Sequence, residues 1–193
     1  MTEIDWDQIH KSGKEYTLMP DQLVDLMLER ANDPKTALDI ACGTGDLVVK
    51  LARRGLAVTG VDVSGIALDK AKEKLSEAGA NAALIEADFN APNFSKKLSG
   101  PFNIIVIRLS LAFVNDKDAF LEKVKGLLAG DGVFICTTPV LLAGQTYDDR
   151  QNRSSINESK LIGMLQKHFS SVSVLISDEV ARPNWPLRTY LCR

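Results

Sequence analysis

A short turn rich in small residues constrains this chain more than any other feature. Residues 37–46 read Ala-Leu-Asp-Ile-Ala-Cys-Gly-Thr-Gly-Asp. An apolar run contains the acid Asp39, small residues follow at Ala41, Gly43 and Gly45, and an amphipathic stretch then begins. Glycine permits a sharp turn and lets a ligand approach the main chain without a Cβ in the way. The pattern predicts a strand, a tight turn open to a ligand, and a helix.

A second acid supports this interpretation. The apolar run Leu56–Val61 ends in Asp62, which lies 17 residues beyond Gly45. An acid at the end of the second strand of such a unit can accept hydrogen bonds from ribose hydroxyls. Two strand-like segments that each carry a terminal acid, with a small-residue turn after the first, predict a nucleoside-binding site.

The composition is that of an ordinary globular protein and argues against several classes of function. The 193 residues suit one domain, with 45% hydrophobic and 25% charged residues. The net charge of −2 does not favour a nucleic-acid binder, and no apolar run is long enough to span a bilayer. The polar N-terminus differs from a signal peptide. We therefore expect a cytoplasmic protein that does not bind membranes.

The cysteines and histidines give no sign of a metal site. Cys42, Cys136 and Cys192 are odd in number and far apart, which predicts reduced, buried thiols. None of them pairs with His10 or His168 at metal-ligand spacing. We interpret Cys42 as a packed small residue rather than a nucleophile, and both histidines as surface or helix-end residues without a partner.

Strand-like and helix-like segments alternate after residue 35, which predicts a parallel α/β sheet. Residues 139–153 read as a polar loop. The last two strand-like segments alternate in polarity, which predicts an antiparallel edge hairpin. The expected strands are 36–41, 56–62, 82–86, 102–107, 133–137, 172–176 and 187–191, and the expected helices are 20–31, 46–54, the segment between Ser64 and Gly79, 116–128 and 155–169.

Over roughly residues 36–138 the chain resembles the class I S-adenosylmethionine-dependent methyltransferases. The matching segments are Leu38–Gly45, Val61–Ser64, Glu86–Phe89 and Phe102–Leu109. The resemblance implies a doubly wound, Rossmann-like α/β fold of seven strands in the order 3-2-1-4-5-7-6, with the last strand antiparallel. It also implies S-adenosylmethionine as the cofactor, S-adenosylhomocysteine as the product and a small-molecule methyl acceptor, and it assigns no oligomeric state.

We expect a single methyltransferase domain over residues 1–193. It would comprise an N-terminal cover and helix (1–34), a cofactor-binding core (35–138), and a loop, helix and C-terminal hairpin (139–193). The lead segment loosely resembles that of thiopurine- and tellurite-type methyltransferases, in which it folds over the cofactor. The alternative is a helix that packs its aromatic residues on the core. The lead residues concerned are Trp6, Asp7, Gly13 and Tyr16.

By resemblance, the turn would hold the methionine part of the cofactor. Its carbonyl groups and Asp39 would face the ammonium and sulfonium charges. The family usually has glycine where this chain has Ala41, and alanine fits there if it keeps a negative φ. The turn residues assigned to the cofactor are Asp39, Ala41, Cys42, Gly43 and Gly45. A plain strand–helix turn is the alternative.

The remaining cofactor residues follow the second, third and fourth strands. Asp62, beside Val63, would bind the ribose hydroxyls, although it also suits a helix cap. Asp88 would bind the adenine amino group and Phe89 would support the ring, whereas an acid in a surface turn is the alternative for Asp88. Arg108 would border the methionine part and the substrate, unless it is an ordinary surface arginine.

Other functions remain as alternatives. A nicotinamide-dependent oxidoreductase also uses a glycine turn, but Val48 replaces its third small residue and Asp39 would repel a pyrophosphate. A nucleic-acid or protein methyltransferase is a second alternative, although residues 108–113 lack the paired prolines of enzymes that methylate exocyclic amines. A non-catalytic cofactor-binding domain is expected to lose the turn or Asp62. No catalytic residue is assigned, because a sulfonium donor needs mainly alignment and exclusion of water.

Overall fold

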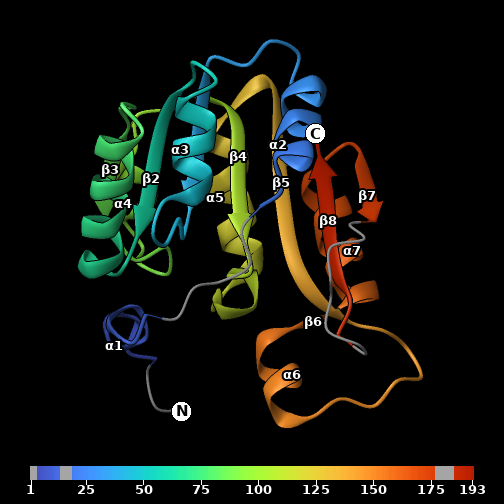
Figure 1. Ribbon diagram of the computed structural model, residues 1–193. Helices are drawn as coiled ribbons and strands as arrows, with labels where there is room; N and C mark the ends of the chain where they lie inside the picture. The colour runs from blue at the N-terminus through green and yellow to red at the C-terminus, as the bar shows by residue number, and fades with distance from the viewer. Residues whose placement is uncertain (1–3, 14–18, 177–184) are drawn as a thin grey trace.

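One sheet runs through the middle of the molecule. The computed structural model describes residues 4–13, 19–176 and 185–193. The strand order is β3-β2-β1-β4-β5-β8-β7, with β6 paired to β5 (Figure 1). The strands are β1 (Thr36–Ile40), β2 (Ala57–Asp62), β3 (Ala83–Glu86), β4 (Phe102–Arg108), β5 (Leu128–Leu141), β6 (Ile156–Asn157), β7 (Val172–Ile176) and β8 (Leu187–Cys192).

The predicted topology is confirmed. Without the short β6, the seven strands counted in chain order follow 3-2-1-4-5-7-6. β8 runs antiparallel to both β5 and β7, as the alternating C-terminal segments indicate. The helices are α1 (Trp6–Lys11), α2 (Asp21–Arg30), α3 (Asp46–Ala52), α4 (Gly65–Glu77), α5 (Lys117–Leu127), α6 (Asp149–Ser154) and α7 (Glu158–His168), with 3₁₀ turns η1 (Phe94–Lys97) and η2 (Leu111–Phe113).

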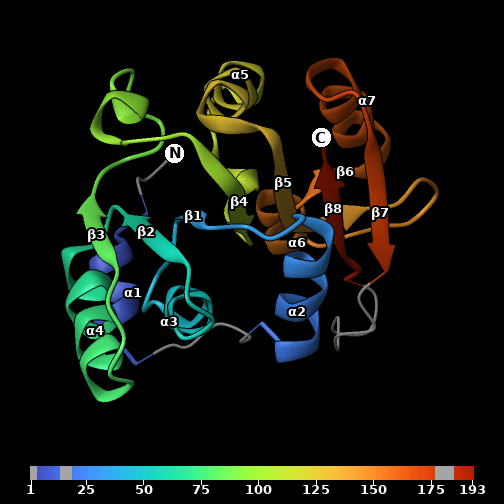
Figure 2. The same cartoon turned by 90° about the horizontal axis from the view of Figure 1, so that it is seen from above.

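Helices cover both faces of the sheet (Figure 2). The continuous apolar run of β4 explains this, because Ile105 and Ile107 pack with α5 and α7 while Ile104 and Val106 pack with α2 and α3. A strand buried on both faces needs such a run. In register, Ile40 lies opposite both Val61 and Ile107. The carboxyl ends of β1, β2 and β4 therefore meet at one edge of the sheet.

Strand β5 is longer than predicted. It begins at Leu128 rather than at residue 133, and its pairing with β4 shifts register between Phe102 and Ile104. A Cβ on Gly132 would lie 2.9 Å from the carbonyl oxygen of Phe102. The Gly-Asp-Gly segment that reads as a turn is therefore an irregularity within the strand, where glycine permits close approach of two backbones.

The predicted loop over 139–153 is also wrong in part. β5 continues to Leu141, and α6 forms at 149–154. The helix begins with a capping box, in which the side chains of Asp148 and Gln151 each accept a hydrogen bond from the backbone N–H of the other residue. The helix predicted over 155–169 is shorter, because residues 156–157 pair with β5 as β6 before α7 begins at Glu158.

The described residues contain neither a membrane-spanning helix nor a cluster of metal ligands. None of the helices in the described ranges combines the length and apolarity needed to cross a membrane. Within the same ranges, no group of three or more histidine, cysteine or acidic side chains is placed to hold a metal ion.

Candidate functional site

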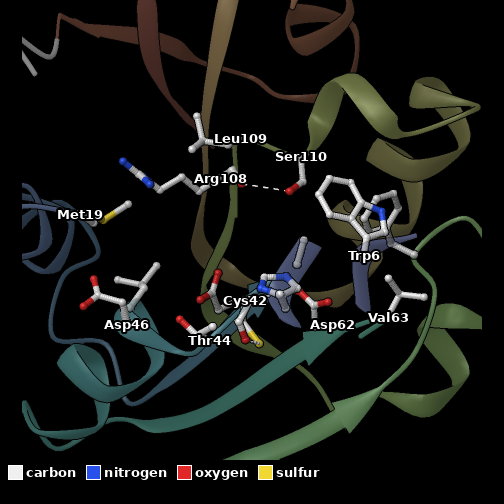
Figure 3. A pocket seen from close by; sticks show the side chains of 16 residues that line it. Trp6, Met19, Cys42, Thr44, Asp46, Asp62, Val63, Arg108, Leu109 and Ser110 are labelled. Carbon is white, nitrogen blue, oxygen red and sulfur yellow. Dashed lines mark hydrogen bonds between the residues drawn. The ribbon is translucent and has the colours of Figure 1, made fainter. Parts of the chain in front are cut away.

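A pocket lies at the carboxyl ends of β1, β2 and β4 (Figure 3). Trp6 and Val63 stand at one end of it, and Met19 and Asp46 at the other. Eight of the ten residues predicted from the sequence line this pocket: Asp39, Ala41, Cys42, Gly43, Asp62, Val63, Phe89 and Arg108. The other lining residues are Trp6, His10, Met19, Thr44, Asp46, Leu47, Leu109 and Ser110. Gly45 and Asp88 are outside the lining.

The turn after β1 has a left-handed backbone at three positions. Gly43 and Gly45 have φ of +53° and +77°, which suits glycine. Ala41 has φ of +59°, so the expectation that alanine keeps a negative φ is wrong. A left-handed residue with a Cβ costs roughly 1–2 kcal/mol. The turn therefore stores strain beside the pocket.

Gly45 has a packing role rather than a place on the pocket wall. A Cβ at this position would lie 2.6 Å from the Cβ of Ala71 in α4. At Gly43 the nearest atom to such a Cβ is Cε1 of His10, at 3.8 Å. The first glycine therefore faces the pocket, and the second lets α4 pack against the start of α3.

Asp62 organises the second side of the pocket. Its Oδ2 accepts the N–H of Gly43 at 2.8 Å, and its Oδ1 accepts the N–H of Ser64 at 2.9 Å. Ser64 in turn caps α4 by accepting the N–H of Ala67. The carboxylate therefore joins the turn after β1 to the start of α4, and each oxygen keeps a lone pair for another donor.

Asp39 is buried among other charged groups. Burial, and secondly the charge of Asp62, raise the pKa of Asp39 to about 8, whereas Arg108 lowers it and Asp46 raises it. At neutral pH without a ligand this carboxyl group therefore holds a proton. A positive charge placed beside it would favour the ionised form.

This pKa predicts a pH-dependent cost to folding. Asp39 titrates near 3.8 in an unfolded chain and at about 8 in the folded one, so the free energy of unfolding falls as pH rises through that window. Asp39→Asn should match the parent near pH 4 and exceed it by about 1 kcal/mol or more at pH 9. Urea unfolding at the two pH values measures this. Asp69→Asn, an exposed site, is the control, and an equal gain for Asp39→Asn at both pH values would contradict the assignment.

Cys42 lines the pocket as an uncharged thiol. Burial, and then the charges of Asp39 and Asp62, raise the pKa of Cys42 well above its usual value. A thiol is a nucleophile only as its thiolate. The interpretation of Cys42 as a packed small residue therefore agrees with its surroundings.

The two residues after β3 differ in position. Phe89 lines the pocket and makes an edge contact with Phe120, with ring centroids 6.2 Å apart. Asp88 is exposed and accepts the N–H of Asn90 at 2.8 Å, as expected for an acid in a turn. Arg108, at the end of β4, is half-buried on the pocket wall.

Helix α1 closes the pocket on the side of Val63. Trp6 meets Phe113 of η2 edge to face, with centroids 5.3 Å apart. Ser64 Oγ donates to Asp7 at 2.5 Å, and Lys70 Nζ donates to the carbonyl oxygen of His10 at 2.6 Å. Helix α1 thus both lines the pocket, through Trp6 and His10, and packs the ring of Trp6 on Phe113. Gly13 does not line the pocket, and Tyr16 lies outside the described residues.

The two histidines lie at helix ends, as expected, but neither is on the surface, and His168 has a partner. His10 is only 6% exposed and lines the pocket. His168 is buried at the end of α7, with Nε2 2.7 Å from Oδ1 of Asp118. A lone histidine carries no periodic signal, because its burial depends on which distant helix packs over it.

Comparisons with known proteins agree with this geometry. A family model described as a methyltransferase domain matches residues 31–182. The chain belongs to this methyltransferase-domain family. The resemblance drawn from the motifs is thereby confirmed.

Two relatives and one solved structure illustrate the family. Demethylmenaquinone methyltransferase of Thermus thermophilus is 35% identical over 111 residues, 56% of this chain and 48% of that protein. Magnesium-protoporphyrin O-methyltransferase of Rhodobacter capsulatus is 30% identical over 168 residues, 81% of this chain and 72% of that protein. The chain thus spans about half the length of the Thermus protein.

The similarity to a solved structure concerns the fold and not the function. An S-adenosylmethionine-dependent methyltransferase from Clostridium acetobutylicum superimposes with a TM-score of 0.70 at 18% identity, covering 97% of this chain and 95% of that one. The Rossmann-like arrangement of this methyltransferase domain therefore extends over nearly the whole chain.

Proposed function

We propose that this protein transfers a methyl group from S-adenosylmethionine to a small molecule. One observation carries the proposal: three carboxyl groups, of Asp39, Asp46 and Asp62, line one pocket at the edge of a parallel sheet. Ligands of such sheets bind outside the carboxyl ends of the strands, where the strand order reverses. A ligand that carries an ammonium and a sulfonium charge complements these acids.

The residues of the pocket fit the cofactor. Oδ2 of Asp46 is buried, accepts no hydrogen bond within the described residues and lies 3.5 Å from Lys50 Nζ. An acid in this condition suits a cationic ligand group. Asp39 and Asp46 would face the methionine part, Asp62 the ribose and Phe89 the adenine ring. Gly43 leaves room for the ligand to approach the backbone.

The chemistry asks for alignment rather than for an acid or base. Bound S-adenosylmethionine would supply an activated methyl group. The chain's own residues would hold that group in line with the acceptor and exclude water, which can contribute roughly 7–11 kcal/mol at most. Trp6, packed on Phe113, covers one end of the pocket, and Leu109 and Ser110 line the wall after β4.

The acceptor is proposed to be a small molecule. The named relatives act on demethylmenaquinone and magnesium-protoporphyrin, which supports this class without naming the substrate of this chain. We propose that the acceptor reaches the pocket beside Arg108 and η2. The division into a cover (1–34), a core (35–138) and a C-terminal part (139–193), and a cytoplasmic location, belong to the same proposal.

Ligand binding and labelling test the proposal. In calorimetry, S-adenosylhomocysteine should bind and NAD should not, because the acids Asp39 and Asp46 beside the turn offer no favourable contact to a pyrophosphate. Incubation of a metabolite extract with methyl-labelled S-adenosylmethionine should then label one class of small molecule, identified by mass spectrometry. Tighter binding of NAD than of S-adenosylhomocysteine would overturn the proposal, and label in protein or nucleic acid alone would overturn the small-molecule part.

A further inference from the structure

We infer that His10 is a second recognition group for the ribose of the cofactor, acting from the lead helix opposite Asp62. The inference rests on the proposed function and assigns a role that no motif of the sequence indicates. It starts from a polar atom of α1 that the fold buries without giving it a partner.

Nδ1 of His10 is buried and makes no hydrogen bond within the described residues. The side chain is 6% exposed and lines the pocket. Leaving a buried polar group without a hydrogen bond costs roughly 1–3 kcal/mol. Such groups are rare and call for a reason. A ligand hydroxyl at this place would satisfy the ring nitrogen.

Three contacts fix the helix that carries the imidazole. Lys70 donates a hydrogen bond to the backbone carbonyl oxygen of His10. Asp7, one helical turn earlier, accepts a hydrogen bond from Ser64 at the start of α4. Trp6 is four residues before His10, on the same face of α1, and its ring packs on Phe113. A helix held in this way presents the ring to a ligand with little further loss of backbone entropy.

The imidazole and Asp62 face the same space. Cε1 of His10 lies 3.8 Å from the position of a Cβ on Gly43, and the N–H of Gly43 donates to Asp62. The carbon atom between the two ring nitrogens therefore lies near the turn whose N–H group Asp62 accepts. A ribose hydroxyl bound to Asp62 would come within reach of both groups.

The two groups complement each other chemically. An ionised Asp62 can only accept hydrogen bonds, whereas each ribose hydroxyl is both a donor and an acceptor. After the hydroxyl has donated to Asp62, its oxygen still needs a donor. The Nδ1–H tautomer of His10 can supply one from the side of α1.

Calorimetry with variants and analogues tests this role. His10→Ala should weaken binding of S-adenosylhomocysteine about 3- to 10-fold. His10→Asn should recover most of the affinity, because its side chain places a polar atom near the position of Nδ1. Gln8→Ala, an exposed site on the same helix, is the matched control. An unchanged affinity for His10→Ala would overturn the inference, and the Asn variant decides if the Ala variant fails to fold.

The analogues identify the ligand group. The loss caused by His10→Ala should persist with 5′-methylthioadenosine, which keeps the ribose but lacks the amino acid part. It should vanish with either the 2′-deoxy or the 3′-deoxy form of S-adenosylhomocysteine. A loss confined to ligands that carry the amino acid part would overturn the ribose assignment. If the parent protein itself binds no S-adenosylhomocysteine, the proposed function fails instead.

Discussion

Asp62→Ala is expected to lower the affinity for S-adenosylhomocysteine about a hundredfold or more. Under the proposed assignment the change removes an acceptor for two ribose hydroxyls, and hydrogen bonds to charged groups contribute roughly 1.5–3 kcal/mol each. It also leaves the N–H groups of Gly43 and Ser64 without their acceptor. The turn after β1 and the start of α4 then lose the side chain that joins them, so binding falls further. Calorimetry measures the affinity.

Asp69→Asn provides the control for the Asp62 variant. Asp69 lies in α4, which follows Asp62 in the chain, and its exposed side chain pairs with Lys72 at the surface. An affinity of Asp62→Ala within threefold of the parent would contradict the ribose assignment. Thermal melting of both variants separates a lost ligand contact from a lost fold.

Alanine at Gly45 and at Gly43 should have different effects. At Gly45 the new Cβ meets Ala71 at 2.6 Å in a backbone of φ +77°, so left-handed strain and overpacking together cost about 2–5 kcal/mol. For a chain of this size the melting temperature should fall on the order of 10 °C. At Gly43 only the strain applies, because the nearest atom is 3.8 Å away.

For ligand affinity the order of the two variants should be the opposite: Gly43→Ala should lose more affinity than Gly45→Ala. A Cβ on Gly43 enters the space beside Asp62 and His10 that the ligand needs, so Gly43→Ala should lower affinity about tenfold or more, a difference of about 1.4 kcal/mol. Melting curves and calorimetry on both variants measure the two quantities. Equal melting temperatures, or tighter binding by Gly43→Ala than by folded Gly45→Ala, would contradict the division of roles.

The sheet could be predicted because its signals are local. Apolar runs mark β1, β2 and β4, and their polar ends, Asp39, Asp62 and Arg108, all line the pocket. Parallel strands bring their carboxyl ends to one edge, so residues far apart in sequence meet there without any knowledge of side-chain packing. The pattern of apolar runs that end in polar residues thus indicates most of the residues that line the pocket after β1, β2 and β4.

Other features depend on contacts that the pattern does not contain. α6 has no apolar face, and its stability comes from the capping box of Asp148 and Gln151. Val48 stands where the dinucleotide-binding motif has its third small residue, yet α3 packs closely on β2. The reason is that Gly60 of β2 leaves room for the Val48 side chain, since a Cβ on Gly60 would lie only 2.9 Å from it. The small residue stands on the strand rather than on the helix.

The attachment of α1 also bears on how the molecule folds. The hydrogen bonds that α1 accepts, from Ser64 to Asp7 and from Lys70 to the carbonyl oxygen of His10, join residues 57 and 60 positions apart. Such contacts form only after a long loop has closed, and they contribute nothing to the pairing of β1, β2 and β4. We therefore expect helix α1 to dock after the central strands have paired, so that Trp6 and His10 join the pocket only once the sheet beneath it exists.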